Sequence, residues 1–111
     1  MESAEELREA YTERVLQVAE SVPPGRVISY GGIADVLAAH GYGGGPRQVG
    51  RVMATEGGAV PWWRVVRADG TLPGHLHGRA RQHYLTEGTP LHRLDAPTRV
   101  DIARAWWQPE V

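Results

Sequence analysis

Cysteine is absent from this 111-residue sequence, and the absence excludes disulfide bonds, zinc sites built from thiolates and any thiol nucleophile. Lysine and asparagine are also absent, so arginine supplies all of the basic charge apart from histidine. Serine occurs only at positions 3, 21 and 29, which we expect to be a frayed terminus, a helix end and a helix cap. A serine-based catalytic triad is therefore not expected either.

Long hydrophobic runs are missing as well. No apolar stretch approaches the roughly 18 residues that a membrane span requires, and the acidic N-terminus does not resemble a signal peptide. We therefore expect a cytoplasmic protein with no membrane contact. With 41% hydrophobic residues, the chain should form one domain, residues 1–111, with a modest core.

The net charge of −1 conceals a segregation of charge along the chain. Residues 1–25 hold six glutamates and two arginines, a net charge of −4, whereas residues 26–81 hold seven arginines against three acidic residues, a net charge of +4. The arginine usage of a GC-rich genome would explain why lysine is missing, but not this separation. Because clustered arginines attract phosphate, we expect the central region to face nucleic acid.

The apolar spacing predicts a mainly α chain. Residues 4–22 have an amphipathic pattern that Pro23 and Pro24 end. Ser29 is a suitable N-cap for a helix that ends near His40. Pro46 suits the start of another helix, which runs to about Thr55. Two short helices joined by a glycine-containing loop suggest a helix-turn-helix.

Beyond the helix-turn-helix, residues 65–72 contain an Asp-Gly pair between short apolar stretches and predict a β-hairpin. Residues 79–86 predict a further helix. Residues 89–111 carry enough apolar side chains to pack back on the body. The fold class expected is a winged-helix-like helix-turn-helix domain with a small β-hairpin.

Two arginines lie on the second helix of the predicted motif. Arg47 and Arg51 are four residues apart, hence on one face, opposite Val49 and Met53. They are either DNA contacts or ordinary solvated side chains. Gly50, on the same helix, would allow close approach of backbone or DNA.

Adjacent tryptophans at positions 62 and 63 are the most unusual local feature. Neighbours in an extended segment point to opposite faces, so one indole can pack inward while the other lines a cleft. On composition alone, the core is the more usual place for both side chains.

Two motifs together identify a resemblance. Residues 24–31 read Pro-Gly-Arg-Val-Ile-Ser-Tyr-Gly and residues 61–65 read Pro-Trp-Trp-Arg-Val. Both are similar to segments of the O6-alkylguanine-DNA alkyltransferases, in which the second segment reads Pro-Cys-His-Arg-Val and the cysteine accepts the alkyl group. Trp62 stands in place of that cysteine and Trp63 in place of the histidine. The chain thus resembles, over roughly residues 22–88, the alkyltransferase-like proteins, which recognise the same damaged base but do not repair it.

The resemblance implies binding to the minor groove of double-stranded DNA that contains O6-alkylguanine, with the damaged nucleotide flipped out. Arg47 would replace the flipped nucleotide and Tyr30 would help to rotate it. The DNA-binding positions would be Tyr30, Arg47, Gln48, Gly50 and Arg51. Backbone groups near Trp62 would read the base edge, and a basic side chain of residues 75–79 would lie against the base. The lesion pocket would be formed by Tyr30, Trp62, Trp63, Val65, Val66, His75 and Arg79.

The resemblance also implies what the chain lacks. Without the cysteine and the histidine no catalytic residue and no cofactor are expected, and Glu87, which matches the glutamate that orients the family's histidine, would have lost that task. Arg64 would brace the loop. His75 and His77 form a His-x-His pair, but no cysteine or nearby carboxylate completes a tetrahedral set, so no metal site is expected.

The partners implied are nucleotide excision repair proteins, bound by a monomer at the bacterial nucleoid. The acidic helix is a candidate docking surface for them. A sequence-preferring helix-turn-helix regulator remains the main alternative, and such a protein usually binds paired half-sites as a dimer. A protein-interaction module and an enzyme with an unexpected nucleophile are further alternatives.

Overall fold

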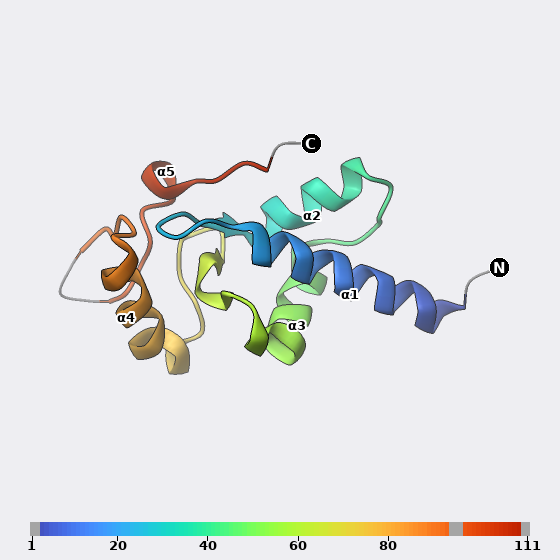
Figure 1. Ribbon diagram of the computed structural model, residues 1–111, viewed down its shortest axis with the longest axis horizontal. Helices are drawn as coiled ribbons and strands as arrows, with labels where there is room; N and C mark the ends of the chain where they lie inside the picture. Colours follow the sequence, from blue (N-terminus) through green and yellow to red (C-terminus); the bar gives the residue numbers. More distant parts are fainter. Residues whose placement is uncertain (1–2, 94–96, 110–111) are drawn as a thin grey trace.

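The computed structural model describes residues 3–93 and 97–109, and its described part is mainly helical (Figure 1). The helices are α1 Ala4–Ser21, α2 Tyr30–Ala39, α3 Pro46–Glu56, α4 His77–Glu87 and α5 Ile102–Ala105. The strands are β1 Ile28–Ser29 and β2 Val65–Val66. Short 3-10 turns occur at Gly57–Ala59, Trp62–Arg64 and Gly74–Leu76. In the described ranges no helix is both long and apolar enough to cross a membrane.

The long helix α1 begins at a cap, because the Ser3 hydroxyl accepts a hydrogen bond from the Glu6 backbone N–H at 3.1 Å. Ser3 is thus a cap rather than part of a frayed end. Val15 and Ala19, on the inner face, are fully buried, whereas Leu7 is 56% exposed. The first turns of α1 extend beyond the body of the molecule, which explains the exposure (Figure 1).

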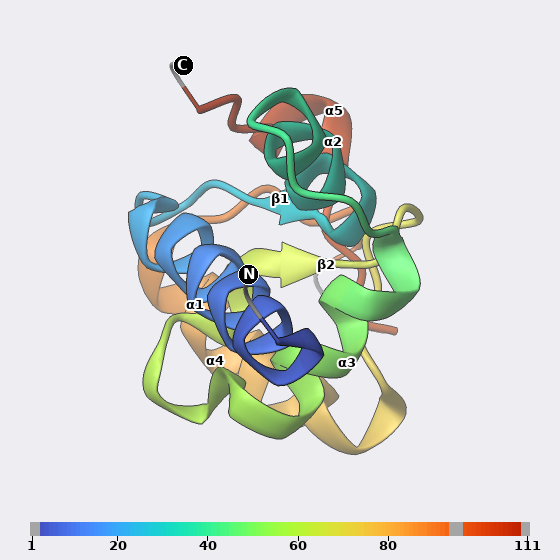
Figure 2. The same ribbon diagram turned by 90° about the vertical axis from the view of Figure 1, so that its right-hand side faces the viewer.

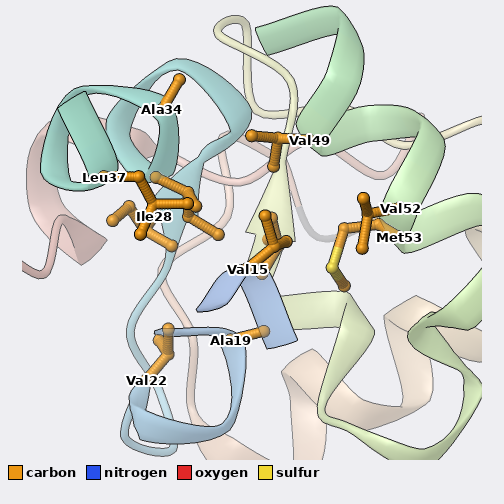
Figure 3. Packing of buried hydrophobic residues seen from close by; sticks show 11 residues of the cluster. Val15, Ala19, Val22, Ile28, Ala34, Leu37, Val49, Val52 and Met53 are labelled. Atoms are coloured by element: carbon orange, nitrogen blue, oxygen red, sulfur yellow. The ribbon is translucent and has the colours of Figure 1, made fainter. Parts of the chain in front are cut away.

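Helices α2 and α3 form the predicted helix-turn-helix. The Ser29 hydroxyl caps α2 by accepting from the Gly32 N–H at 2.9 Å, and α3 begins at Pro46 as expected. Ile33 of α2 and Val49 of α3 are fully buried in a shared core with α1. Figure 3 shows how side chains from all three helices meet there. The core therefore fixes α3 against α2 and leaves its outer face free.

The predicted β-hairpin is wrong, although its turn forms. Arg67 N–H donates to the Thr71 carbonyl at 2.9 Å around the Asp-Gly pair, but the chain beyond the turn does not pair with β2. Instead β2 pairs in parallel with β1, Ile28 opposite Val65, as the neighbouring arrows in Figure 2 show. Val65 and Val66 are both fully buried. A strand with two interior faces needs a partner inside the molecule, and β1 supplies one.

The C-terminal segment closes the other edge of β1. The Val27 N–H donates to the Ala105 carbonyl at 3.0 Å, and the Trp107 N–H donates to the Val27 carbonyl at 2.9 Å. Val100 N–H donates to the Gly70 carbonyl at 2.9 Å, so the same segment also covers the Asp-Gly turn. The prediction that this region packs back on the body is confirmed for residues 97–109.

Candidate nucleic-acid interface

Trp62 lies on the wall of a cavity of about 440 Å³ between α3 and α4. This volume falls within the roughly 300–1,000 Å³ usual for small-molecule sites. The lining residues come from α2, α3, the two turns between α3 and β2, and the segment 67–79: Tyr30, Gly50, Met53, Ala54, Gly57, Gly58, Trp62, Arg67, Leu72, Pro73, His75, Leu76 and Arg79. Of the predicted pocket residues, Tyr30, Trp62, His75 and Arg79 are therefore together in one cavity.

The two tryptophans diverge as predicted, but not because the segment is extended. Residues 62–64 form a 3-10 turn, and the two indole planes are perpendicular with centroids 5.5 Å apart. Trp63 is not a lining residue of the cavity. Its ring stacks on His83 at 3.5 Å, nearly parallel. It also packs against a second core cluster, separate from the core of α1, α2 and α3 and formed by Val27, Val66, Leu72, Ala80, Tyr84, Val100 and Ala105. Trp62 faces the cavity and Trp63 anchors the turn.

Glu87 holds this turn in place: with no histidine at position 63 to orient, its carboxylate binds the tryptophan at that position instead. Its carboxylate accepts from the Trp63 indole N–H at 3.1 Å, from the Gly25 backbone N–H at 3.1 Å and from Arg64 at 2.5 Å and 3.2 Å. Arg64 also donates to the Val22 carbonyl at 2.9 Å, as a brace should. Burial acts to raise the pKa of Glu87, but the hydrogen bonds from Arg64, Gly25 and Trp63 outweigh it and lower that pKa.

Tyr84 adds a further restraint from α4. Its hydroxyl donates to the Trp63 carbonyl at 2.5 Å, and burial strongly raises the pKa of the phenol. The neutral, hydrogen-bonding form is thereby maintained far above neutral pH. The turn is fixed through both the side chain and the backbone of Trp63.

Arg79 and His83 approach the tryptophans from one face of α4, since they are four residues apart. The Arg79 guanidinium lies 5.3 Å from the centroid of the Trp62 ring, a cation–π contact, and His83 meets the same ring edge-on at 5.9 Å. His77 is different: its Nε2 atom lies 2.7 Å from the Leu72 carbonyl oxygen. His77 therefore braces the loop.

Val65 and Val66 do not line the cavity with their side chains. Both are fully buried in β2, because the strand lies between the two core clusters. The prediction that their side chains line the pocket is therefore wrong. Only their backbone groups remain candidates for reading the edge of the flipped base.

A second hollow of about 620 Å³ adjoins the cavity and leads to the start of α3. It is lined by Tyr30, Gly31, Pro46, Arg47, Gly50, Arg67 and Ala68, so three residues are shared with the cavity. Arg47 is exposed at its edge. Tyr30 and Arg67 both lie at the junction of this hollow with the cavity. Burial raises the pKa of Tyr30, and the nearby charge of Arg67 opposes that rise. We refer to this hollow as the Arg47 groove.

Gln48 and Arg51 lie elsewhere. They line a hollow of about 450 Å³ between α1 and α3, beside Leu7 and Tyr11. The Gln48 side chain accepts from the Gly45 N–H at 3.1 Å and so caps α3. The expectation that Arg51 shares a working face with Arg47 is not supported, because the two arginines line different hollows. Gly50 does separate the groove from the cavity, and a methyl group added there would meet the Tyr30 ring at 3.6 Å, an ordinary contact.

Sequence reasoning missed Arg67 and His83. Arg67 belongs to both hollows and is the first polar residue after the buried strand β2. The position of Arg67 directly after a buried strand could have marked it as a candidate site residue. The four-residue spacing of Arg79 and His83 on a predicted helix could likewise have shown that they share one face. The stacking of His83 on Trp63 could not be read from the spacing, because it depends on where α4 packs.

Comparison with known proteins gives concordant results. Residues 10–88 match the family described as the DNA-binding domain of 6-O-methylguanine DNA methyltransferase. A protein named DNA base-flipping protein from Escherichia coli K12 is 34% identical over 106 residues, covering 92% of this chain and 78% of its own length. A protein of the same name from Vibrio parahaemolyticus is 30% identical over 100 residues, covering 86% of this chain and 94% of its own length.

Two solved structures share the fold. Schizosaccharomyces pombe Atl1 in complex with damaged DNA containing O6-carboxymethylguanine superposes with a TM-score of 0.72 at 24% identity, over 91% of this chain and 97% of that one. The complex of the S. pombe protein with DNA gives the same values. The mainly α, helix-turn-helix architecture is thereby confirmed.

Proposed function

This chain belongs to the family of the 6-O-methylguanine DNA methyltransferase DNA-binding domain, and from that premise we propose that it recognises O6-alkylguanine in DNA by flipping the damaged nucleotide into the cavity beside Trp62, without repairing it. The relatives named DNA base-flipping proteins support the flipping, and S. pombe Atl1 bound to damaged DNA supports the lesion. The observation that carries the proposal is a base-sized cavity with an indole where the alkyl-accepting thiol would stand.

No other side chain takes over the role of the thiol. The sequence has no cysteine, and its three serines have structural tasks. Ser3 and Ser29 cap helices, and the Ser21 hydroxyl donates to the Gln17 carbonyl at 2.9 Å. Alkyl transfer needs a nucleophile activated by a base, and Trp63 cannot act as that base. We propose that the protein is not an enzyme.

The two adjoining hollows suit the steps of nucleotide flipping. The Arg47 groove would receive the duplex, with Arg47 filling the space that the flipped nucleotide leaves. Tyr30 and Arg67, at the junction, would guide the phosphate of that nucleotide. An alkylated guanine pairs poorly, so extruding it costs less than the few kcal/mol of a normal pair. Contact with the Trp62 indole would add about 1–3 kcal/mol.

Recognition without chemistry requires a second activity to remove the lesion. We propose that nucleotide excision repair proteins bind the complex of this protein with distorted DNA, and that the protein acts as a monomer. Addition of the protein should accelerate incision by a purified excision nuclease at an O6-methylguanine duplex. An unchanged incision rate at saturating protein would refute this part of the proposal.

The central test is binding to two duplexes of one sequence, one with a single O6-methylguanine and one with guanine. We expect at least tenfold tighter binding to the lesion, which is about 1.4 kcal/mol. Both must be measured at one salt concentration, since phosphate contacts make affinity salt-dependent. Mass spectrometry of protein and DNA after incubation should find the methyl group still on the DNA. Equal affinities would refute lesion recognition, and a methylated protein would refute the absence of chemistry.

A further inference from the structure

A basic surface lies in the C-terminal segment, beyond residue 88, where the match to the family model ends. Residues 90–92 and 99–101 form a short antiparallel ladder, in which Leu91 pairs with Val100 and the His92 N–H donates to the Arg99 carbonyl at 3.0 Å. We call these six residues the C-terminal ladder. None of them lines the cavity beside Trp62 or the Arg47 groove. Lesion recognition in the cavity therefore leaves the ladder without a task.

The ladder presents two basic side chains on its outer face. Arg99 is exposed while its neighbour Val100 is fully buried, because successive residues of a strand point to opposite faces. His92 lies opposite Arg99 and is exposed as well, since opposed residues of an antiparallel pair share one face. Of the six residues of the ladder only Asp101, which is partly buried before the start of α5, is acidic.

Contacts with the Asp-Gly turn fix the ladder beside the Arg47 groove. The Val100 N–H donates to the Gly70 carbonyl at 2.9 Å, and a Cβ atom added to Gly70 would overlap the Val100 carbonyl. Gly70 follows three residues after Arg67, a lining residue of the Arg47 groove. In Figure 2 the loop after β2 lies on the same side of the molecule as the start of α3. The ladder thus continues the surface that would receive the duplex.

Three arginines follow one another along this surface: Arg47 at the edge of the groove, Arg67 at its junction with the cavity, and Arg99 beyond the turn. Within the part of the chain that the structure describes, Arg99 forms no salt bridge. Asp69, the carboxylate of the turn, accepts from the Thr71 N–H at 3.0 Å and from the Thr71 hydroxyl at 2.6 Å. That carboxylate is thus engaged in its own turn, and the Arg99 guanidinium is available to a ligand.

On the premise of the proposed function, we propose that the C-terminal ladder is a second DNA contact, at which Arg99, with His92 beside it, binds a backbone phosphate outside the flipped nucleotide. A guanidinium matches the geometry of phosphate and can donate two parallel hydrogen bonds to it. Contacts to phosphate position a protein on the duplex without reading its sequence. The ladder therefore raises the affinity for damaged and undamaged DNA alike, while selectivity for the lesion stays with the cavity.

One exposed phosphate contact has a small effect on affinity but a characteristic dependence on salt. Because Arg99 is exposed, water and ions screen its charge, and we expect its loss to weaken binding about three- to fivefold. Each phosphate that a protein neutralises releases condensed counterions and contributes about 0.9 to the slope of log K against log salt concentration. Loss of one contact should reduce the magnitude of that slope by about 0.9.

The test measures dissociation constants by fluorescence anisotropy at several salt concentrations, on two duplexes of one sequence that carry one O6-methylguanine or guanine. Wild type, Arg99→Gln, Arg99→Lys and Arg8→Gln are compared. Lysine keeps the charge and can still bind phosphate. Arg8 is a matched control, since it is an exposed arginine of α1 that lines neither the cavity nor the Arg47 groove. Thermal unfolding of each variant checks that the fold is intact.

We expect Arg99→Gln to weaken binding to both duplexes by the same factor and to reduce the salt slope by about 0.9. Arg99→Lys should retain most of the affinity, and Arg8→Gln should behave as the wild type. Unchanged affinity and slope in Arg99→Gln overturn the second contact. Weaker binding of the damaged duplex alone also overturns it, because a flanking phosphate is present in both duplexes. A loss in Arg99→Lys as large as in Arg99→Gln overturns it too, because the charge is then not the cause.

A second experiment locates the contact along the duplex. The O6-methylguanine is moved stepwise towards one end and then towards the other, at constant duplex length. In one of the two series the difference between wild type and Arg99→Gln should disappear once the duplex ends before the ladder. A difference that persists in both series overturns a contact outside the flipped nucleotide. Equal wild-type affinity for damaged and undamaged DNA overturns the proposed function, whereas the comparison of wild type with Arg99→Gln on unmodified DNA tests the ladder independently.

Discussion

Replacing Glu87 by alanine should destabilise the protein more than any substitution of an exposed charge, because one carboxylate serves four donors. The donors are the Gly25 and Trp63 N–H groups and two nitrogens of Arg64. The side chains of Arg64 and Glu87 are only 14% and 11% exposed. Loss of one partner of a buried ion pair costs about 3–5 kcal/mol. Since Arg64 keeps its bond to the Val22 carbonyl, we expect about 3 kcal/mol.

A double substitution separates the pair from its surroundings. In Arg64→Met with Glu87→Met no charge is left unpaired, so this double variant should lose about 2 kcal/mol less stability than the sum of the losses in Arg64→Met and Glu87→Met alone. Urea denaturation followed by tryptophan fluorescence gives each free energy of unfolding. Glu20→Ala, an exposed glutamate of α1, is the control and should change stability by less than about 0.5 kcal/mol.

The pH dependence provides a second measurement on the same residue. The pKa of Glu87 is lower in the folded protein than its ordinary 4.5, so its stabilising effect is complete above that value. It is lost as the pH falls through the lower folded value. The difference in stability between wild type and Glu87→Gln should therefore be constant from neutral pH down to about pH 5 and shrink below 4.5. A loss under about 1 kcal/mol in Glu87→Ala at neutral pH, or strictly additive single variants, would refute this account of the turn.

Three further predictions concern the groove, the missing nucleophile and the Asp-Gly turn. Arg47→Ala should weaken binding to lesion DNA at least tenfold, roughly 1.4 kcal/mol, with an unchanged melting temperature; unchanged binding would exclude it from the interface. Trp62→Cys should not acquire methyl transfer by mass spectrometry, because Trp63 cannot activate a thiol; a methylated variant would contradict our description of the site. Gly70→Ala should lower the free energy of unfolding, measured by denaturation, by about 3 kcal/mol, because φ at Gly70 is +87° and an added Cβ would overlap the Val100 carbonyl. The control Gly78→Ala has open space around the added methyl group and should leave stability unchanged or raise it.

Much of the fold followed from the sequence because helices are encoded locally. The spacing of apolar residues, the Ser29 cap and Pro46 at the start of α3 gave α1, α2 and α3 to within about two residues, since caps and periodicity act over one or two turns. Helix α4 was also expected, and it begins earlier, at His77, directly after a 3-10 turn. The resemblance to the alkyltransferase-like proteins was likewise inferred from short contiguous motifs and from the absence of cysteine.

Tertiary structure alone decided the partner of β2. The Asp-Gly pair correctly indicated a turn, but a turn does not require its two arms to pair. Val65 and Val66 are both interior, and the strand that satisfies their backbone is Ile28–Ser29, far back in the chain. Such pairing depends on burial across the whole molecule, which no local pattern contains.

The site divides in the same way. The sequence determined that the chain has no thiol and that arginines gather in the central region, and it led to the proposal that an indole stands in place of the family's cysteine. Which indole faces the cavity was decided by contacts between distant residues, above all Glu87 with Gly25, 62 positions apart, and His83 with Trp63. Side-chain direction at a turn follows from such contacts, because the turn itself fixes only the backbone.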